Sequence, residues 1–244
     1  MGIIITIILG IFMLIGVAVV KLVHNSKVIE QLSIAIALGT MSSLVILELI
    51  PEIWETFQGK NLIFAALAIG IGIAGLKLLD RFIPDHEEGT EESQEQSDAT
   101  MIHIGIISAI AIILHNIVEG MAVYSITTES FKVGILVALG VGLHNIPMGM
   151  LMYSTLEKES RKKRFIILAM AAISTFIGGL AMALVSPVLN EFVIGILICI
   201  ALGMLLYIII FELIPHLIHC KNWRLTVPGL LVGVVIILIS TFLE

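Results

Sequence analysis

Long apolar runs separated by short polar segments follow one another along the whole chain. Eight of them approach or exceed the roughly 20 residues that a helix needs to cross the hydrocarbon core of a bilayer. They cover Ile3–Val20, Gln31–Thr56, Leu62–Leu79, Ile102–Ile126, Val133–Tyr153, Phe165–Val185, Phe192–His216 and Leu225–Phe242. The runs are continuous rather than alternating, which excludes a transmembrane β-barrel. The pattern therefore predicts an all-α polytopic membrane protein with eight transmembrane helices.

Composition supports this class. The 244 residues are 59% hydrophobic and only 13% charged, and the mean hydropathy is +1.12. A soluble domain has a much smaller apolar share, and eight spans leave no room for one of any size. We therefore expect residues 1–244 to form a single membrane domain. The first run lacks a basic start and a cleavage site, so we interpret it as a helix and not as a removed signal peptide.

Lysine and arginine residues predict the orientation of the chain. Eleven of the thirteen lie in the connections after the first, third, fifth and seventh spans, and the other two are Lys60 and Lys132. Cytoplasmic loops carry such an excess of basic residues. We therefore expect both termini outside and the connection between the third and fourth spans in the cytoplasm.

That connection, residues 80–100, is acidic. The stretch 85–98 reads "DHEEGTEESQEQSD" and holds seven carboxylates without a lysine, arginine or aromatic residue. Such a segment cannot bury enough apolar surface to fold alone, so we predict an acidic disordered cytoplasmic loop. It is either a solvated linker or a weak collector of cations.

Two segments of the chain resemble one another. Residues 36–52, "IALGTMSSLVILELIPE", and residues 200–216, "IALGMLLYIIIFELIPH", share IALG and ELIP at a constant offset of 164. The first copy lies in the second span and the other in the seventh, which run in opposite directions. Unless the match is chance similarity between apolar helices, it predicts a 3+2+3 arrangement in which spans 1–3 and 6–8 form an inverted repeat. Inverted repeats are typical of secondary transporters, with the substrate site near mid-membrane.

A polar pair also occurs twice, inside the fourth and fifth spans. "HNIVEG" places His115, Asn116 and Glu119 near the middle of one, and "HNIPMG" places His144, Asn145 and Met148 near the middle of the other. Positions i and i+4 share a helix face, so His115 lies over Glu119 and His144 over Met148. The short connection makes the two spans antiparallel neighbours, so we expect the clusters to face one another.

These residue types favour a metal site. Imidazoles and a carboxylate are the usual ligands of zinc and related divalent ions. A carboxylate at mid-bilayer costs about 2.5–3.5 kcal/mol on insertion scales, so it needs a partner or an aqueous cavity. The alternative is that these polar groups only tie helices together by hydrogen bonds.

Three prolines lie close to ionisable residues. Pro147 lacks an N–H and would free the carbonyl one turn earlier, beside His144. Pro51 and Pro215 would do the same beside Glu48 and Glu212. Free carbonyls at membrane depth are tolerated where they line a cavity, so we interpret all three prolines as helix-breaking features near a site or pathway.

At these residues the chain resembles the ZIP metal transporters, especially their short bacterial members. "HNIVEG" is similar to the family's HN-x-x-[DE]-G on the fourth helix, and "HNIPMG" to its HN-x-P-E-G on the fifth. The resemblance implies uptake of a divalent metal, most often Zn²⁺, with Fe²⁺, Mn²⁺, Co²⁺ and Cd²⁺ taken by relatives. It implies that His115, Glu119 and His144 are primary-site ligands, and that Asn116 and Asn145 occupy positions serving a second site in binuclear members.

The chain departs from that family at two positions. Met148 stands where a glutamate usually bridges both metals, and Gly178 where some bacterial members carry an acid. The second site keeps only amides, so we predict a single metal at this centre. Met148 either adds a thioether ligand that favours softer ions or only fills space.

Further ionisable residues lie along the expected pathway. Glu48 approaches the outer end of the second span, and Glu212 and His216 the inner end of the seventh, so we assign these three a pathway or gating role. Glu52 and His219 fit helix-end solvation or structural pairing equally well. We assign no role to the remaining histidines, which are His24, His86 and His103.

We therefore predict a transporter that moves a divalent cation, most favourably zinc, into the cytoplasm through His115, Glu119 and His144. The resemblance implies a bacterial plasma membrane, with the bilayer and the metal substrate as partners, no nucleic acid, and a homodimer left open. Alternating access follows from the repeat, with channel-like passage as the alternative. Two other functions remain: a transport-dead metal sensor, and an intramembrane metalloenzyme, which would normally show the absent H-E-x-x-H motif.

Overall fold

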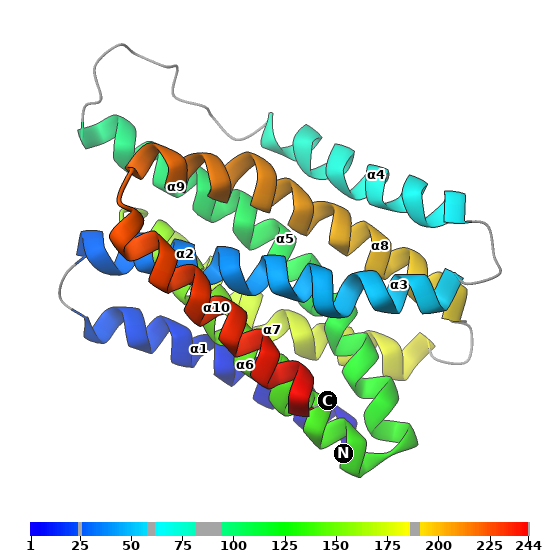
Figure 1. Ribbon diagram of the computed structural model, residues 1–244. Coiled ribbons are helices and arrows are strands. Elements are labelled where there is room, and N and C mark those ends of the chain that lie inside the picture. Colours follow the sequence, from blue (N-terminus) through cyan, green and yellow to red (C-terminus); the bar gives the residue numbers. More distant parts are fainter. Residues whose placement is uncertain (24–25, 58–61, 82–93, 186–190, 244) are drawn as a thin grey trace.

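The computed structural model describes residues 1–23, 26–57, 62–81, 94–185 and 191–243, which are helical almost throughout and contain no strand. Eight helical segments are long and apolar enough to cross a membrane, which confirms the predicted all-α fold (Figure 1). The elements are α1 (Gly2–Leu22), α2 (Ser26–Leu44), η1 (Val45–Leu49), α3 (Ile50–Phe57), α4 (Leu62–Asp80), α5 (Gln94–Glu129), α6 (Phe131–Thr155), α7 (Arg161–Val185), α8 (Glu191–Tyr207), η2 (Ile208–Leu213), α9 (Ile214–Cys220) and α10 (Trp223–Leu243).

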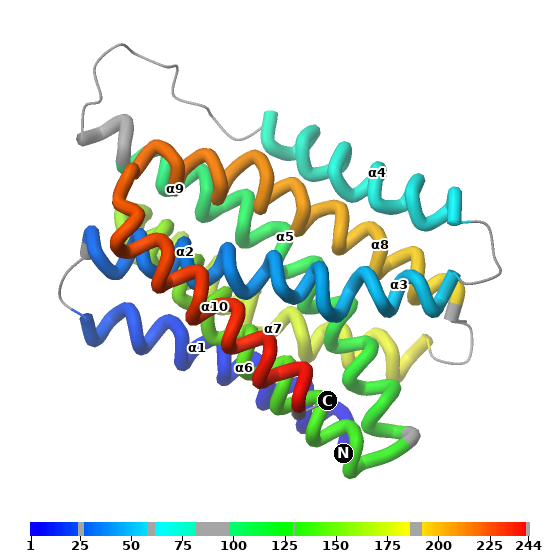
Figure 2. Tube along the Cα trace, viewed as in Figure 1, coloured from blue at the N-terminus to red at the C-terminus, as the bar shows by residue number. Residues whose placement is uncertain are grey.

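Two of the spans contain a π-helical turn. In Figure 2, α2 continues through η1 into α3, and α8 continues through η2 into α9. The N–H of Ile50 donates to the carbonyl of Val45 at the end of η1, and that of Ile214 donates to Ile209 at the end of η2. Pro51 and Pro215 follow directly and cannot donate, so the helix widens before each of them instead of breaking.

Pro147 behaves differently. The helix α6 runs through it without interruption, so the expected break at this position is absent. Neighbouring helices can re-satisfy the backbone groups that a proline leaves unpaired in a membrane helix, and the residues around Pro147 are buried among such neighbours.

The spans differ in how deeply they are buried. The spans that contain α2 and α3, α5, α6, and α8 and α9 have most of their residues inside the bundle, whereas α1, α4, α7 and α10 are mainly exposed at its surface. The two termini lie at the same end of the bundle (Figure 1). Helices α5 and α6, which carry the two polar pairs, thus belong to the interior group.

Glycines bring five pairs of helices so close together that a side chain at the glycine would meet a backbone carbonyl of the partner helix, and we call these contacts glycine seams. A side chain at Gly39 on α2 would collide with the carbonyl of Leu230 on α10, and one at Gly203 on α8 with the carbonyl of Ile69 on α4. The remaining contacts are Gly233 on Ile36, Gly72 on Ile200, Gly149 on Met13, Gly16 on Ile146, Gly10 on Ala172, Gly120 on Thr175 and Gly178 on Ile117. The seams therefore join α2 to α10, α4 to α8, α1 to α6, α1 to α7 and α5 to α7. Small residues permit such close approach in membranes, where van der Waals packing drives association.

The acidic segment lies mainly outside the described residues. Its disorder over residues 82–93 therefore stays a prediction. Residues 94–100, in contrast, belong to the first turns of α5. Glutamine and glutamate are good helix formers, and acidic residues are favourable at a helix N-terminus, so this helix starts before the apolar run begins.

Candidate metal centre

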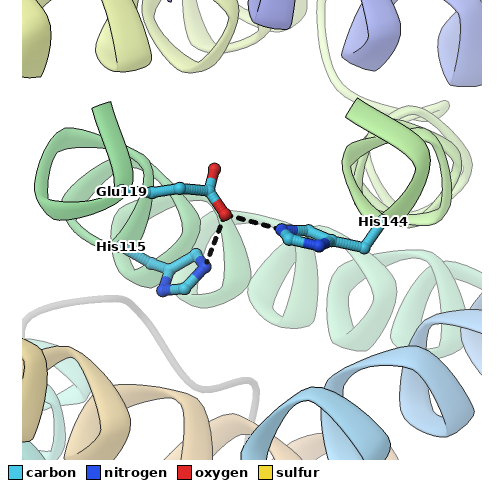
Figure 3. A group of neighbouring side chains, drawn as sticks. All are labelled: His115, Glu119 and His144. Carbon is cyan, nitrogen blue, oxygen red and sulfur yellow. Dashed lines mark hydrogen bonds and ion pairs between the residues drawn. The ribbon is translucent and has the colours of Figure 1, made fainter. Parts of the chain in front are cut away.

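Three of the predicted ligands meet in the interior of the bundle. His115 and Glu119 project from α5 toward His144 on α6 (Figure 3). Nε2 of His144 lies 2.6 Å from Oε1 of Glu119, and Nε2 of His115 lies 3.5 Å from the same oxygen. One ligand atom from each residue lies within 4.8 Å of the other two, close enough for all three to hold one ion.

These side chains are almost entirely removed from the surface. They are 6%, 9% and 1% exposed for His115, Glu119 and His144 respectively. A buried carboxylate is costly unless it is paired and hydrogen-bonded. The two imidazoles meet that need in the structure, and a divalent cation would meet it with a larger charge.

A cavity of about 250 Å³ reaches these residues. Glu48 and Glu52, from η1 and α3, line it together with His115, Glu119 and His144. The hydroxyl of Thr241 on α10 donates to Oε1 of Glu48 at 3.0 Å. The cavity thus connects Glu48 and Glu52 with the centre. From the sequence alone these two carboxylates and the centre were separate groups.

The two asparagines differ in position. Asn145 lies beside the centre, with its Nδ2 donating to Oε2 of Glu119 at 3.5 Å. Asn116 instead donates to the carbonyl of Ala171 on α7 at 3.5 Å. Of the two predicted second-site amides, only Asn145 contacts Glu119 among the described residues.

Met148 and Gly178 are both buried away from the cavity. The Met148 side chain is fully buried in the main hydrophobic core, and it is absent from the described lining of the cavity. Gly178 packs against the carbonyl of Ile117, so an acidic side chain cannot occupy this position while α5 and α7 keep their seam. The packing thus leaves no space for a carboxylate at position 178.

The predicted inner pathway residues do not line this cavity. Glu212 instead lies near two residues that the sequence reasoning had not connected with it, Asp80 and His103. His103 was assigned no role, although an ionisable residue beside a membrane span is itself a signal of function. His216 lies farther along α9, where its Nε2 is 3.5 Å from Sγ of Cys220.

The His115, Glu119 and His144 group suits a borderline divalent ion. Imidazole and carboxylate are ligands for zinc, and three protein ligands leave a coordination position open for water. The single carboxylate neutralises only half of a 2+ charge.

Comparison with known proteins places the chain among metal transporters. Residues 83–241 match the family model described as "ZIP Zinc transporter". The zinc transporter ZupT of Chlorobium luteolum is 32% identical over 235 residues, which cover 90% of this chain and 88% of the relative. The zinc transporter ZupT of Streptococcus mutans is 28% identical over 233 residues, covering 90% and 88%. The relative from Clostridium perfringens with the same description is 28% identical over 239 residues, covering 86% and 84%. On this match and on its eight membrane-spanning helices, the chain belongs to the ZIP family of metal transporters.

Proposed function

We propose that this protein carries zinc, or a similar divalent cation, into the cytoplasm through a single-ion centre formed by His115, Glu119 and His144. As a member of a transporter family it is an integral membrane protein, not an enzyme, and the named relatives are zinc transporters. The observation that carries the proposal is the convergence of the three buried side chains in the wall of a cavity that Glu48 and Glu52 also line.

The distribution of basic residues gives the pathway its proposed orientation. The excess of lysine and arginine after the odd-numbered spans favours a cytoplasmic position for those connections and outside positions for both termini. In this orientation Glu48 and Glu52 lie on the outer side of the centre, and Glu212 and His216 on the inner side. An ion would enter past the first pair and leave past the second.

The proposal of a single ion rests on the absence of an acidic side chain at positions 148 and 178. Met148 belongs to the hydrophobic core and Gly178 to a seam, so neither supplies a second carboxylate. The buried Oδ1 of Asn145 has no hydrogen-bond partner among the described residues. Rotation of this amide would add a neutral oxygen to the same ion.

Structural matches at the sequence offset of 164 support an inverted repeat and, with it, alternating access. Gly39 and Gly203 are equivalent by this offset; the first forms a seam with α10 and the second with α4. The π-helical turns end at Leu49 and Leu213, which are also equivalent. Two structurally related halves around one central site suit a mechanism in which one group of helices moves against another.

Uptake into proteoliposomes tests the proposal. The purified chain is reconstituted into vesicles that contain a metal-sensitive dye, and zinc is added outside. We expect Glu119→Gln and His115→Ala to reduce the initial rate at least about tenfold, because even outer-shell changes reduce metal affinity by about this factor.

Glu55→Gln is the matched control for the carboxylate, because Glu55 is exposed on α3 and does not line the cavity. It should leave the rate unchanged. Unchanged uptake in both centre variants would refute the central site. Zinc binding by the wild type without any flux would identify a sensor in place of a transporter.

A further inference from the structure

A hydroxyl group from α10 contacts one of the carboxylates in the wall of the cavity. Oγ1 of Thr241 donates to Oε1 of Glu48 at 3.0 Å, and it is the only hydrogen-bond donor to Glu48 among the described residues. Glu48 belongs to η1 in the second span, whereas Thr241 lies in the last turn of α10. Helix packing and not local sequence brings the two side chains together, because they are 193 positions apart.

This contact is the outer end of a regular pairing between two parallel helices. Near the start of both helices, Nε2 of Gln31 donates to Oγ1 of Thr226 at 3.2 Å, across a separation of 195 positions. At the glycine seam a side chain on Gly233 would lie 2.9 Å from the backbone of Gly39, 194 positions earlier. The three separations are nearly equal, so the second span and α10 keep one register along their length. The whole helix pair therefore determines where the hydroxyl of Thr241 lies.

The direction of this hydroxyl is also fixed. Oγ1 of Thr241 lies 3.0 Å from the carbonyl oxygen of Ile237, one turn earlier on α10. A threonine in a helix is stiff about χ1, and the bond to the carbonyl four residues earlier selects one of its rotamers. The same rotamer brings the hydroxyl within hydrogen-bond distance of Glu48.

The hydrogen bond leaves half of the carboxylate free. Oε1 of Glu48 is occupied by the Thr241 hydroxyl, whereas Oε2 accepts no hydrogen bond from a described residue. An ionised carboxylate has two acceptor oxygens, and one at membrane depth is costly unless a partner or water compensates it. Since Glu48 lines the cavity that reaches the centre, a cation entering this cavity would compensate the second oxygen.

We propose that Thr241 is a positioning residue for ion capture, because it holds Oε1 of Glu48 and leaves Oε2 to bind the entering zinc ion. This inference rests on the proposed function, in which the ion passes Glu48 on its way to the centre. Thr241 itself does not touch the ion. It acts through the carboxylate, as the outer-shell partners of metal ligands do.

The kinetics of zinc uptake test the proposal. The full-length chain is reconstituted into vesicles, and the initial rate is measured over a range of ZnCl₂ concentrations. Thr241→Val keeps the shape of the side chain and removes the hydroxyl, and we expect it to raise KM at least about tenfold. The maximal rate should change by less than about twofold, because the variant weakens capture and leaves the ligands of the centre in place. Thr241→Ser keeps the hydroxyl and should have a KM close to that of the wild type.

Thr226→Val is the matched control. It removes the corresponding hydroxyl at the inner end of the same helix pair, and Thr226 is not among the described residues that line the cavity. Its KM should equal that of the wild type. An equal rise of KM in Thr226→Val and Thr241→Val would show that both variants only loosen the helix pair, which overturns the proposal.

A variant of the carboxylate shows whether Thr241 acts through Glu48. Glu48→Asp keeps the charge but withdraws the oxygens from Thr241, so adding Thr241→Val to it should cause no further rise of KM. A further rise would overturn the proposal, since Thr241 would then act through another group. An unchanged KM in Thr241→Val alone overturns it as well and leaves the proposed function standing. Absence of uptake by the wild type would instead refute the proposed function and, with it, this inference.

Discussion

At the scale of single residues, Glu119 determines the character of the centre. Its Oε1 lies close to both imidazoles, and Asn145 approaches its other oxygen. His144 and Asn145 on α6 thus both contact this one carboxylate on α5. Glu119 therefore carries the negative charge of the centre and links the two helices at this depth.

We expect the Met148 side chain to fill space in the hydrophobic core and not to bind metal. Because its side chain belongs to the core and not to the described cavity lining, Met148→Leu should retain zinc uptake within about twofold. Swaps that conserve core volume usually cost less than about 1.5 kcal/mol. Uptake competition between zinc and cadmium measures the effect on metal preference.

The matched variant for this comparison is His144→Gln, one turn earlier on the same face of α6. It should abolish uptake, because the amide replaces an imidazole that lies 2.6 Å from Glu119. A loss of cadmium competition in Met148→Leu would show instead that the thioether binds metal.

The residues of the centre could be predicted from the sequence, whereas the contact between Asp80, His103 and Glu212 could not. His115, Glu119 and His144 belong to two short motifs on neighbouring spans, so their convergence follows from helix periodicity and a short connection. Asp80, His103 and Glu212 come from three distant parts of the chain and share no motif. Their contact depends on the tertiary packing of α4, α5 and η2, which one sequence does not reveal.

At the scale of elements, the glycine seams can be tested within a single helix. Gly72 on α4 packs against the carbonyl of Ile200, whereas nothing lies within 4 Å of a methyl group added at Gly75 on the same helix. Gly72→Ala should therefore destabilise the protein by about 1–3 kcal/mol, as overpacking does. Gly75→Ala should be neutral or stabilise it by up to about 1 kcal/mol, because alanine favours the helix. Thermal unfolding in detergent compares the two.

Equal unfolding temperatures for these two variants would contradict the seam between α4 and α8. The seams themselves are only partly visible in the sequence. Glycines such as Gly39 and Gly203 are ordinary small residues of membrane helices, and only the repeat marks them as equivalent. Which helix each one contacts is decided by the packing of the whole bundle.

The prolines show a similar limit. Pro51, Pro147 and Pro215 predict the same loss of a backbone donor, and the sequence does not distinguish them. The structure widens the helix into a π-helical turn before Pro51 and Pro215, but keeps α6 continuous at Pro147. Packing against neighbouring helices therefore decides how each proline is accommodated.

At the scale of the whole molecule, the eight spans follow from hydropathy alone, because a helix must be apolar over its full length to cross a bilayer. Orientation is a separate matter and is testable by labelling. In a Cys199→Ser/Cys220→Ser background, Lys132→Cys at the start of α6 should react with a membrane-impermeant maleimide added to intact cells. Ser160→Cys, between α6 and α7, should react only after the cells are opened. Both positions are exposed.

The reverse labelling pattern would show that the protein has the opposite orientation, with Glu48 and Glu52 on the cytoplasmic side of the centre. Labelling of both positions from outside would contradict a cytoplasmic connection after the fifth span. Loss of reaction at Lys132→Cys upon addition of zinc would additionally indicate a movement of α6.

The seams also determine which parts of the protein a bound ion holds together. His115 and Glu119 lie on α5, which meets α7 at a seam, while His144 lies on α6, which meets α1, and Gly10 joins α1 to α7. An ion shared by the three ligands would therefore close a ring of four helices whose other three sides are glycine seams. Its release would remove the link on the remaining side, between α5 and α6.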